Sequence, residues 1–177
     1  MGDFETRANK QNLYEELYRA HHARIVQLCR LWLNDAHEAE DAAHEVFLKL
    51  FRATPAQESA VAWRAWLTRV ALNTCRDRRR SGWWRWWRER SVEFTEVPLS
   101  SPEPTPEEQT VSREAREQIW QLFRGLSVRQ QEVFALRYIA EWSVEEVAQM
   151  LEITPGSVKQ HLFRAVHHLR KALGGQR

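Results

Sequence analysis

The stretch from residue 143 to residue 164, SVEEVAQMLEITPGSVKQHLFR, contains two helix-start signals only eleven positions apart. Ser143 and Glu146 have the spacing of a capping box, in which the serine hydroxyl and the glutamate carboxylate satisfy the first main-chain N–H groups of a helix. Thr154 and Pro155 form the second signal, a capping hydroxyl followed by proline at the first helical position. The spacing predicts two short helices joined by a tight turn.

Each of these two predicted helices has one apolar face. The first face consists of Val144, Val147, Ala148 and Leu151, and the second of Val158, Leu162, Val166, Leu169 and Leu173. The outward positions of the second helix carry Ser157, Lys159, Gln160, Phe163 and Arg164. Two short helices, the second with a polar and basic outer face, indicate a helix-turn-helix whose second helix enters the DNA major groove.

The net charge is only +2, but the charges are unevenly distributed. Residues 76–90 hold seven arginines and two acidic residues, and no acidic residue follows Glu152. Residues 91–112 hold five glutamates and neither lysine nor arginine. Two basic zones around an acidic connector suggest a polyanionic partner with two contact sites, and DNA is the obvious candidate. The alternative is that each charged run is simply a solvated surface.

Three helical patterns of apolar residues occupy the N-terminal half. The first spans residues 12–33. The second begins at Asp35 and Glu38, which again have capping-box spacing, and runs to about residue 51 with an alanine-rich buried face. The third spans about residues 59–80. No segment shows the alternation of a strand, so the sequence predicts an all-α protein.

The segment 91–112 contains four of the six prolines as well as the five glutamates. Such a composition cannot build a core and behaves as an extended spacer. Helices resume after it, and Ser127 with Gln130 forms another capping-box spacing. We therefore expect two small helical domains, residues 1–90 and 113–177, joined by a flexible linker at 91–112.

Several function classes find no support in the residues. Cys29 and Cys75 lie on apolar faces and are expected to be buried thiols in a reducing cytoplasm. No signal peptide or membrane-spanning run is visible, so we expect a cytoplasmic protein without direct membrane contact. His161, His167 and His168 lack metal-ligand spacing, and no nucleophile–base set or glycine-rich phosphate loop is present. We expect no enzymatic activity, no cofactor and no metal.

Three segments in order resemble the extracytoplasmic-function (ECF) sigma factors. They are EAEDAAHEVFLKLF at 38–51, AWRAWLTRVALNTCRDRRR at 62–80 and the helix-turn-helix at 143–164. The first two resemble sigma region 2, and the third, with residues 127–138, resembles region 4. The resemblance implies a protein that binds core RNA polymerase and directs it to particular promoters. It also implies control by an anti-sigma factor, whose identity the sequence does not reveal.

The resemblance assigns a polymerase-binding face to the second helix, at Asp41, His44, Glu45 and Lys49. An exposed acidic cluster on a helix packed through alanines suits a basic partner surface. His44 departs from the glutamine that the family usually has, but an imidazole can still donate a hydrogen bond to a partner. The alternative reading of this face is a solvated acidic surface.

The third helix and its preceding loop, by the same resemblance, open the −10 element and capture an unpaired base. Unpaired bases need aromatic surfaces, polar groups for their edges and cations for their phosphates. The residues that supply these chemistries are Trp63, Arg69, Asn73, Arg76, Arg79 and Arg80. The sequence does not show which of Trp63 and Trp66 is exposed, but Trp66 lies on the apolar stripe and is expected in the core.

The outward residues of the second helix in 143–164 match the positions that read the −35 element in the family. Lysine and arginine contact phosphate or guanine, glutamine pairs with adenine, and phenylalanine packs on a thymine methyl. We therefore expect Ser157, Lys159, Gln160, Phe163 and Arg164 to face the −35 element. Glu152 stands where the family commonly has glycine, so a positive φ at this turn would be strained.

Two questions stay open from the residues alone. The run Trp83–Trp87, WWRWW, fits a cover for the domain core or an inhibitor contact, a DNA-stacking extension, or an interfacial membrane anchor. The helix-turn-helix by itself also fits a repressor or activator with an unrelated N-terminal domain, which would bind its operator without polymerase.

Overall fold

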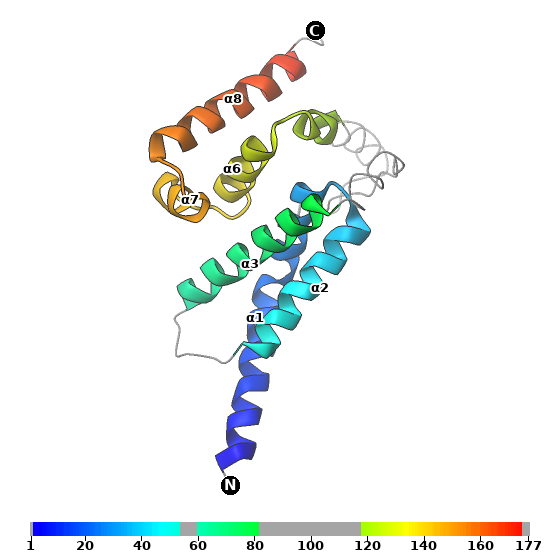
Figure 1. The fold of residues 1–177 in the computed structure, drawn as a ribbon, viewed down its shortest axis with the longest axis vertical. Helices are drawn as coiled ribbons and strands as arrows, with labels where there is room; N and C mark the ends of the chain where they lie inside the picture. The colour runs from blue at the N-terminus through cyan, green and yellow to red at the C-terminus, as the bar shows by residue number, and fades with distance from the viewer. Residues whose placement is uncertain (1, 54–59, 82–117, 175–177) are drawn as a thin grey trace, which may run out of the picture. The chain divides into compact units, whose positions relative to one another are not determined.

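The computed structural model describes residues 2–53, 60–81 and 118–174, and Figure 1 shows that every regular element in these ranges is a helix. The chain divides into two compact units, Met1–Thr95 and Glu96–Arg177. This architecture confirms the predicted all-α class with two small helical domains. The boundary falls within the predicted linker 91–112, but that segment and Trp83–Trp87 lie outside the described residues.

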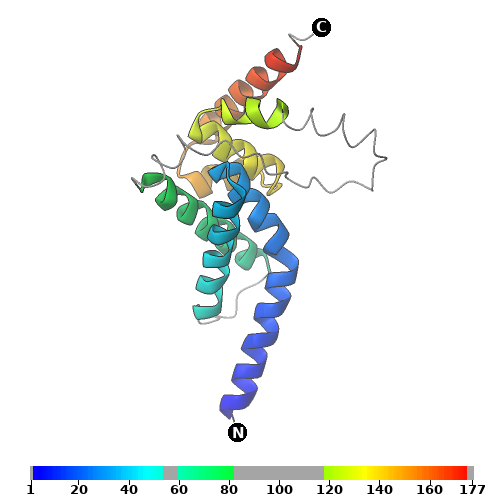
Figure 2. The same cartoon turned by 90° about the vertical axis from the view of Figure 1, so that its right-hand side faces the viewer.

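The first unit consists of three helices, α1 (Gly2–Leu33), α2 (Ala36–Arg52) and α3 (Ala60–Arg80), which pack against one another. Helix α1 begins about ten residues earlier than the apolar pattern predicts, and Figure 2 shows its N-terminal part running past the end of α2. Asn34 adopts a positive φ of 58° between α1 and α2. Asp35 then caps α2 by accepting a 2.7 Å hydrogen bond from the main-chain N–H of Glu38.

Small side chains on α2 form part of the core of the first unit. Ala39, Ala42 and Ala43 are fully buried, as the alanine-rich face predicts. Because an alanine adds little bulk, α1 and α3 can approach α2 closely and bury larger groups such as Trp32 and Leu67. The cysteines of α1 and α3 are free thiols within this core. Helix α2 therefore presents only its other face to partners.

The second unit contains helical residues 118–124 followed by α6 (Val128–Tyr138), α7 (Val144–Leu151) and α8 (Pro155–Gly174). Ser127 and Ser143 both form complete capping boxes, which confirms the two predicted starts. The buried amide of Gln131 donates 3.2 Å hydrogen bonds to the carbonyls of Phe123 and Leu126. This amide ties α6 to the end of the preceding helix.

The turn between α7 and α8 has the strain that its sequence predicts. Glu152 is the C-cap of α7, with φ 56° and ψ 46° in the left-handed region. Thr154 caps α8 by accepting a 3.1 Å hydrogen bond from the main-chain N–H of Ser157. Within the described ranges, no helix combines the length with the apolar character that a bilayer-spanning segment needs.

Candidate nucleic-acid interface

The outer face of α8 carries the side chains expected to read DNA. Lys159, Gln160, Phe163 and Arg164 are all exposed, while Val158 and Ala165 on the opposite face are fully buried against α6 and α7. Phe163 is 72% exposed, the highest value among the exposed large apolar residues that the structure describes. Helix α8 therefore presents a basic, polar and aromatic strip on its outer face, while its inner face packs against α6 and α7.

Ser157 has a different position from the other four predicted contacts. It is half-buried, and its hydroxyl lies 2.9 Å from the capping hydroxyl of Thr154. The cap therefore holds this serine at the first turn of α8. Farther along, the ring of His167 stacks beneath Phe163 with 6.1 Å between ring centroids and 15° between planes, which supports the exposed phenyl ring.

A half-buried histidine, His161, adjoins the exposed strip of α8. Burial lowers the pKa of His161, and the positive charges of Arg129 and Arg164 lower it further. Arg129 lies on α6, where one of its Nη atoms lies 3.2 Å from a carboxylate oxygen of the buried Glu132. The packing of α6 against α8 therefore favours the neutral imidazole.

The four predicted polymerase contacts on α2 fall into two pairs that differ in whether they bond to other residues of the unit. Asp41 and His44 are exposed, and within the part of the chain that the structure describes neither joins an ion pair. Lys49 instead lies 2.7 Å from Glu45 and donates a 3.1 Å hydrogen bond to Thr74 of α3. Half of the predicted face is thus open, and half is engaged within the unit.

Arg78 is a member of this site that the sequence interpretation did not single out. Its Nη atoms lie 2.7 Å from a carboxylate oxygen of Glu38 and 3.3 Å from one of Glu45. Burial acts to raise the pKa of Glu45, but hydrogen bonds and charges from Lys49 and Arg78 outweigh it and lower that pKa overall. Arg78 follows Thr74 by one helical turn, so the inward stripe of α3 could have indicated its position.

The basic end of α3 contains both exposed and internally bonded residues. Arg69, Asn73 and Arg80 are exposed, and Arg76 is half-buried. Arg79 is different, because its guanidinium donates to the main-chain carbonyl of Trp32 at the end of α1, with Nε at 2.6 Å. The predicted −10 contacts are therefore not equally available, and Arg79 already serves a structural role.

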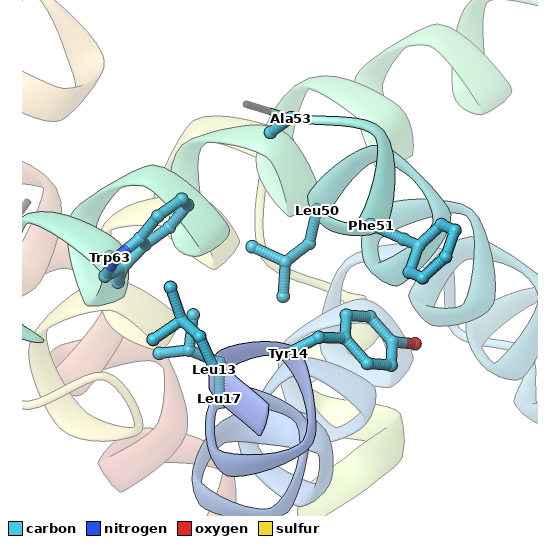
Figure 3. A pocket seen from close by; sticks show the side chains of 7 residues that line it. All are labelled: Leu13, Tyr14, Leu17, Leu50, Phe51, Ala53 and Trp63. Atoms are coloured by element: carbon cyan, nitrogen blue, oxygen red, sulfur yellow. The ribbon is translucent and has the colours of Figure 1, made fainter. Parts of the chain in front are cut away.

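The two tryptophans of α3 correct the expectation drawn from the apolar stripe. Trp63 is buried, with 5% exposure, which contradicts its prediction as a −10 contact, and Trp66, expected in the core, is only half-buried. Trp63 faces side chains of α1 and α2 around a small pocket of about 20 Å³, as Figure 3 shows. Its lining consists of Leu13, Tyr14, Leu17, Leu50, Phe51, Ala53 and Trp63. Trp63 as placed offers no face to a base.

Comparison with known proteins agrees with this two-unit arrangement. Residues 17–85 match the family model for sigma-70 region 2, and residues 116–169 match that for sigma-70 region 4. The three-helix unit and the helix-turn-helix unit thus define a protein of the sigma-70 class.

Relatives that align over nearly their whole length show which kind of sigma factor this is. The chain is 31% identical over 162 residues to the ECF RNA polymerase sigma factor SigL of Mycobacterium tuberculosis, covering 91% of this chain and 89% of SigL. It is 29% identical over 174 residues to the ECF sigma factor SigW of Bacillus subtilis, covering 96% and 93%. The chain belongs to the family of ECF RNA polymerase sigma factors.

A solved structure has the same fold. CnrH, determined in complex with the cytosolic domain of CnrY, matches with a TM-score of 0.64 and covers 94% of this chain and 91% of that one. Because the sequence identity is only 19%, this likeness supports the fold and not the individual contacts.

Proposed function

We propose that this chain is a promoter-specificity factor that binds core RNA polymerase, opens the −10 element with its first unit and reads the −35 element with its second. The observation that carries the proposal is the presence of two separate helical units, each with an exposed basic or polar face, in the order of sigma regions 2 and 4. Acting with polymerase, the protein would work in the cytoplasm.

The proposed polymerase contact is the exposed face of α2. Asp41 and His44 are the open members of the predicted set, and Glu45 and Lys49 adjoin them one and two turns along the helix. An exposed carboxylate beside a histidine suits a basic partner surface, and such complementarity mainly sets encounter rate and specificity.

The proposed −10 contact is the exposed part of α3. Asn73 offers an amide for a base edge, while Arg69, Arg76 and Arg80 supply cations for the phosphates of the strand. Trp63 and Arg79 drop out of this set, because the first is buried and the second caps α1. Trp66, half-buried and edge-on to Trp63, is the aromatic side chain of α3 that retains some exposed surface.

The proposed −35 contact is the strip on α8. Gln160 offers the donor–acceptor pair that matches adenine, and Lys159 and Arg164 suit guanine or phosphate. Phe163 offers an apolar surface for a thymine methyl. Ser157, at the first turn, is positioned for a phosphate and not for a base edge, because its hydroxyl is held by the cap.

We also propose control by a protein that covers these faces. CnrH, which has the same fold, was solved bound to the cytosolic domain of CnrY. An anti-sigma partner of this chain would need to cover the strip on α8 and the open face of α2 to prevent polymerase and promoter binding.

Core binding provides the direct test of this function. The chain should comigrate with core RNA polymerase on a sizing column, and Asp41→Lys should weaken that association at least tenfold by placing a cation against a basic surface. Glu15→Lys makes the same charge change at an exposed position of α1 and should leave core binding unchanged. A wild-type chain that binds duplex DNA tightly alone and shifts no polymerase would instead indicate a conventional repressor or activator.

A further inference from the structure

Four charged side chains connect α2 to α3 in the first unit, and we name them the α2–α3 charge cluster: Glu38, Glu45, Lys49 and Arg78. Two carboxylates and two cations give the cluster a formal charge of zero. The two helices that it joins are the one proposed to bind polymerase and the one proposed to bind DNA. The inference below therefore rests on the proposed function.

The two contacts of Arg78 differ in depth. Its partner Glu38 lies 2.7 Å away with a side chain only 12% exposed, so this pair is the inner one. Its partner Glu45 lies 3.3 Å away with a side chain 42% exposed. A partly buried pair at short distance is screened less by water than an exposed pair. The Glu45 contact is therefore the one that a partner could replace without opening the core.

Glu45 also lies one helical turn after Asp41, on the face proposed for polymerase. A basic group of a docking partner would thus meet Glu45 from the solvent side while Arg78 holds it from the side of α3. The cluster would then contain one cation more than it has carboxylates, since Lys49 and Arg78 stay in place. The added positive charge would lie next to α3. Arg76 and Arg80, which are proposed to contact DNA, lie on this helix two residues before and after Arg78.

We propose that Arg78 is a DNA-phosphate contact held in reserve: Glu45 binds it in the free chain, and polymerase docking on Glu45 releases it to a phosphate of the −10 strand. Glu38 keeps Arg78 in place throughout, so the side chain changes partner without leaving its site. Polymerase binding and DNA binding would be coupled through a single carboxylate. Under this mechanism the free chain holds DNA less tightly than the polymerase-bound chain.

The test removes the charge of Glu45 without polymerase. Binding of a 5′-fluorescein-labelled dT20 oligonucleotide to the full chain is measured by anisotropy over a range of salt concentrations. Glu45→Gln should tighten binding about three- to tenfold and steepen the slope of log K against log salt by about 0.7, the value for one more phosphate contact on a single strand. Arg78→Gln in the Glu45→Gln background should abolish both changes.

Two controls separate this mechanism from a general charge effect. Glu40→Gln removes the same charge from the same helix, but Glu40 pairs with Arg30 of α1 at 2.8 Å, so it should change affinity by less than about twofold without altering the slope. Lys49→Gln in the Glu45→Gln background should retain the gain. A gain equal to that of Glu40→Gln, or one cancelled by the Lys49 change, would overturn the proposal.

A second measurement decides the question should the Arg78→Gln variant fail to fold. The Nε of Arg78 is buried and has no hydrogen-bond acceptor among the described residues. Its ¹⁵N–¹H signal in the full chain should shift on addition of dT20 in Glu45→Gln and stay unchanged in wild type. An unchanged signal in both would contradict the exchange. Core binding by the same variants is scored separately, so failure of the proposed function remains distinguishable from failure of this inference.

Discussion

The guanidinium of Arg79, in the last turn of α3, donates from Nε at 2.6 Å and also from a terminal nitrogen to the main-chain carbonyl of Trp32, near the end of α1. The last four carbonyls of a helix have no partner within it, and a cation there also suits the helix dipole. Arg79, one of a run of arginines, thus caps the C-terminal end of α1, although it lies 47 residues after Trp32 in the chain. The charge run is not a uniform DNA-binding strip.

This contact predicts different roles for neighbouring arginines. Arg79→Gln should lower the free energy of unfolding by about 1.5–3 kcal/mol, the range for a hydrogen bond to a charged group. Arg80→Gln, at an exposed position whose Asp77 contact is 4.0 Å long, should change stability by less than about 0.5 kcal/mol. Urea unfolding of both variants provides the measurement. Equal losses would show that Arg79 has no capping role.

The left-handed turn at Glu152 predicts a stabilising substitution. A non-glycine residue held in the left-handed region destabilises the folded chain by about 1–3 kcal/mol. Replacing it with glycine removes this strain, but glycine also gives the unfolded chain more conformational freedom, which cancels part of the gain. Glu152→Gly should therefore raise the free energy of unfolding of the second unit by about 0.5–1 kcal/mol, measured by denaturant titration. Glu152→Ala keeps a Cβ at φ 56° and should give no such gain.

The environment of His161 predicts a dependence of stability on pH. Because burial, and then Arg129 and Arg164, lower its pKa in the folded chain, the unfolded chain takes up a proton more readily just below pH 6.5. The stabilising contribution of the neutral imidazole is therefore complete above that pH and is lost as the pH falls towards the folded-state pKa. His161→Gln should make stability less sensitive to acid between about pH 7.5 and pH 5.5.

A histidine on the same helix provides the control for this pH effect. His167 is exposed, so His167→Gln removes an imidazole from the same helix without opening the packing of α6 against α8. Unfolding in denaturant at a series of pH values compares the three chains directly. Parallel profiles for wild type and His161→Gln would mean that the packing of α6 against α8 does not disfavour the imidazolium form.

The strip on α8 predicts losses of promoter reading without losses of stability. Gln160→Ala should weaken use of the cognate −35 element by about 1–3 kcal/mol, which is roughly five- to 150-fold, if its amide pairs with adenine. The side chain is exposed, so thermal unfolding should stay within error of wild type. Gln149→Ala, an exposed glutamine on α7, gives a matched control and should leave promoter use unchanged.

Local signals in the sequence predicted the second unit well. Ser127, Ser143 and Thr154 cap the helices that they were expected to start, and the apolar faces between these caps form the core. Caps and turns depend on residues a few positions apart, so spacing alone identifies them. The sequence indicated that a positive φ at Glu152 would be strained, but the left-handed geometry itself is seen only in the structure.

Contacts between distant helices could not be predicted in this way. Glu38 has capping-box spacing after Asp35, yet its carboxylate lies 2.7 Å from Arg78, forty residues away. Trp63 is buried where it meets side chains of α1 and α2, whereas periodicity along α3 did not show which of Trp63 and Trp66 is exposed. Periodicity predicts the inward face of a helix, but which inward residue meets a partner depends on how the other helices pack.

Transcription by purified components tests the central claim most directly. Core RNA polymerase is incubated with genomic DNA of the organism that encodes the chain, with and without the protein, and the RNA 5′ ends are mapped. The account predicts discrete start sites that appear only with the protein, disappear with Asp41→Lys and lose strength with Gln160→Ala. Identical transcripts with and without the wild-type protein would contradict it.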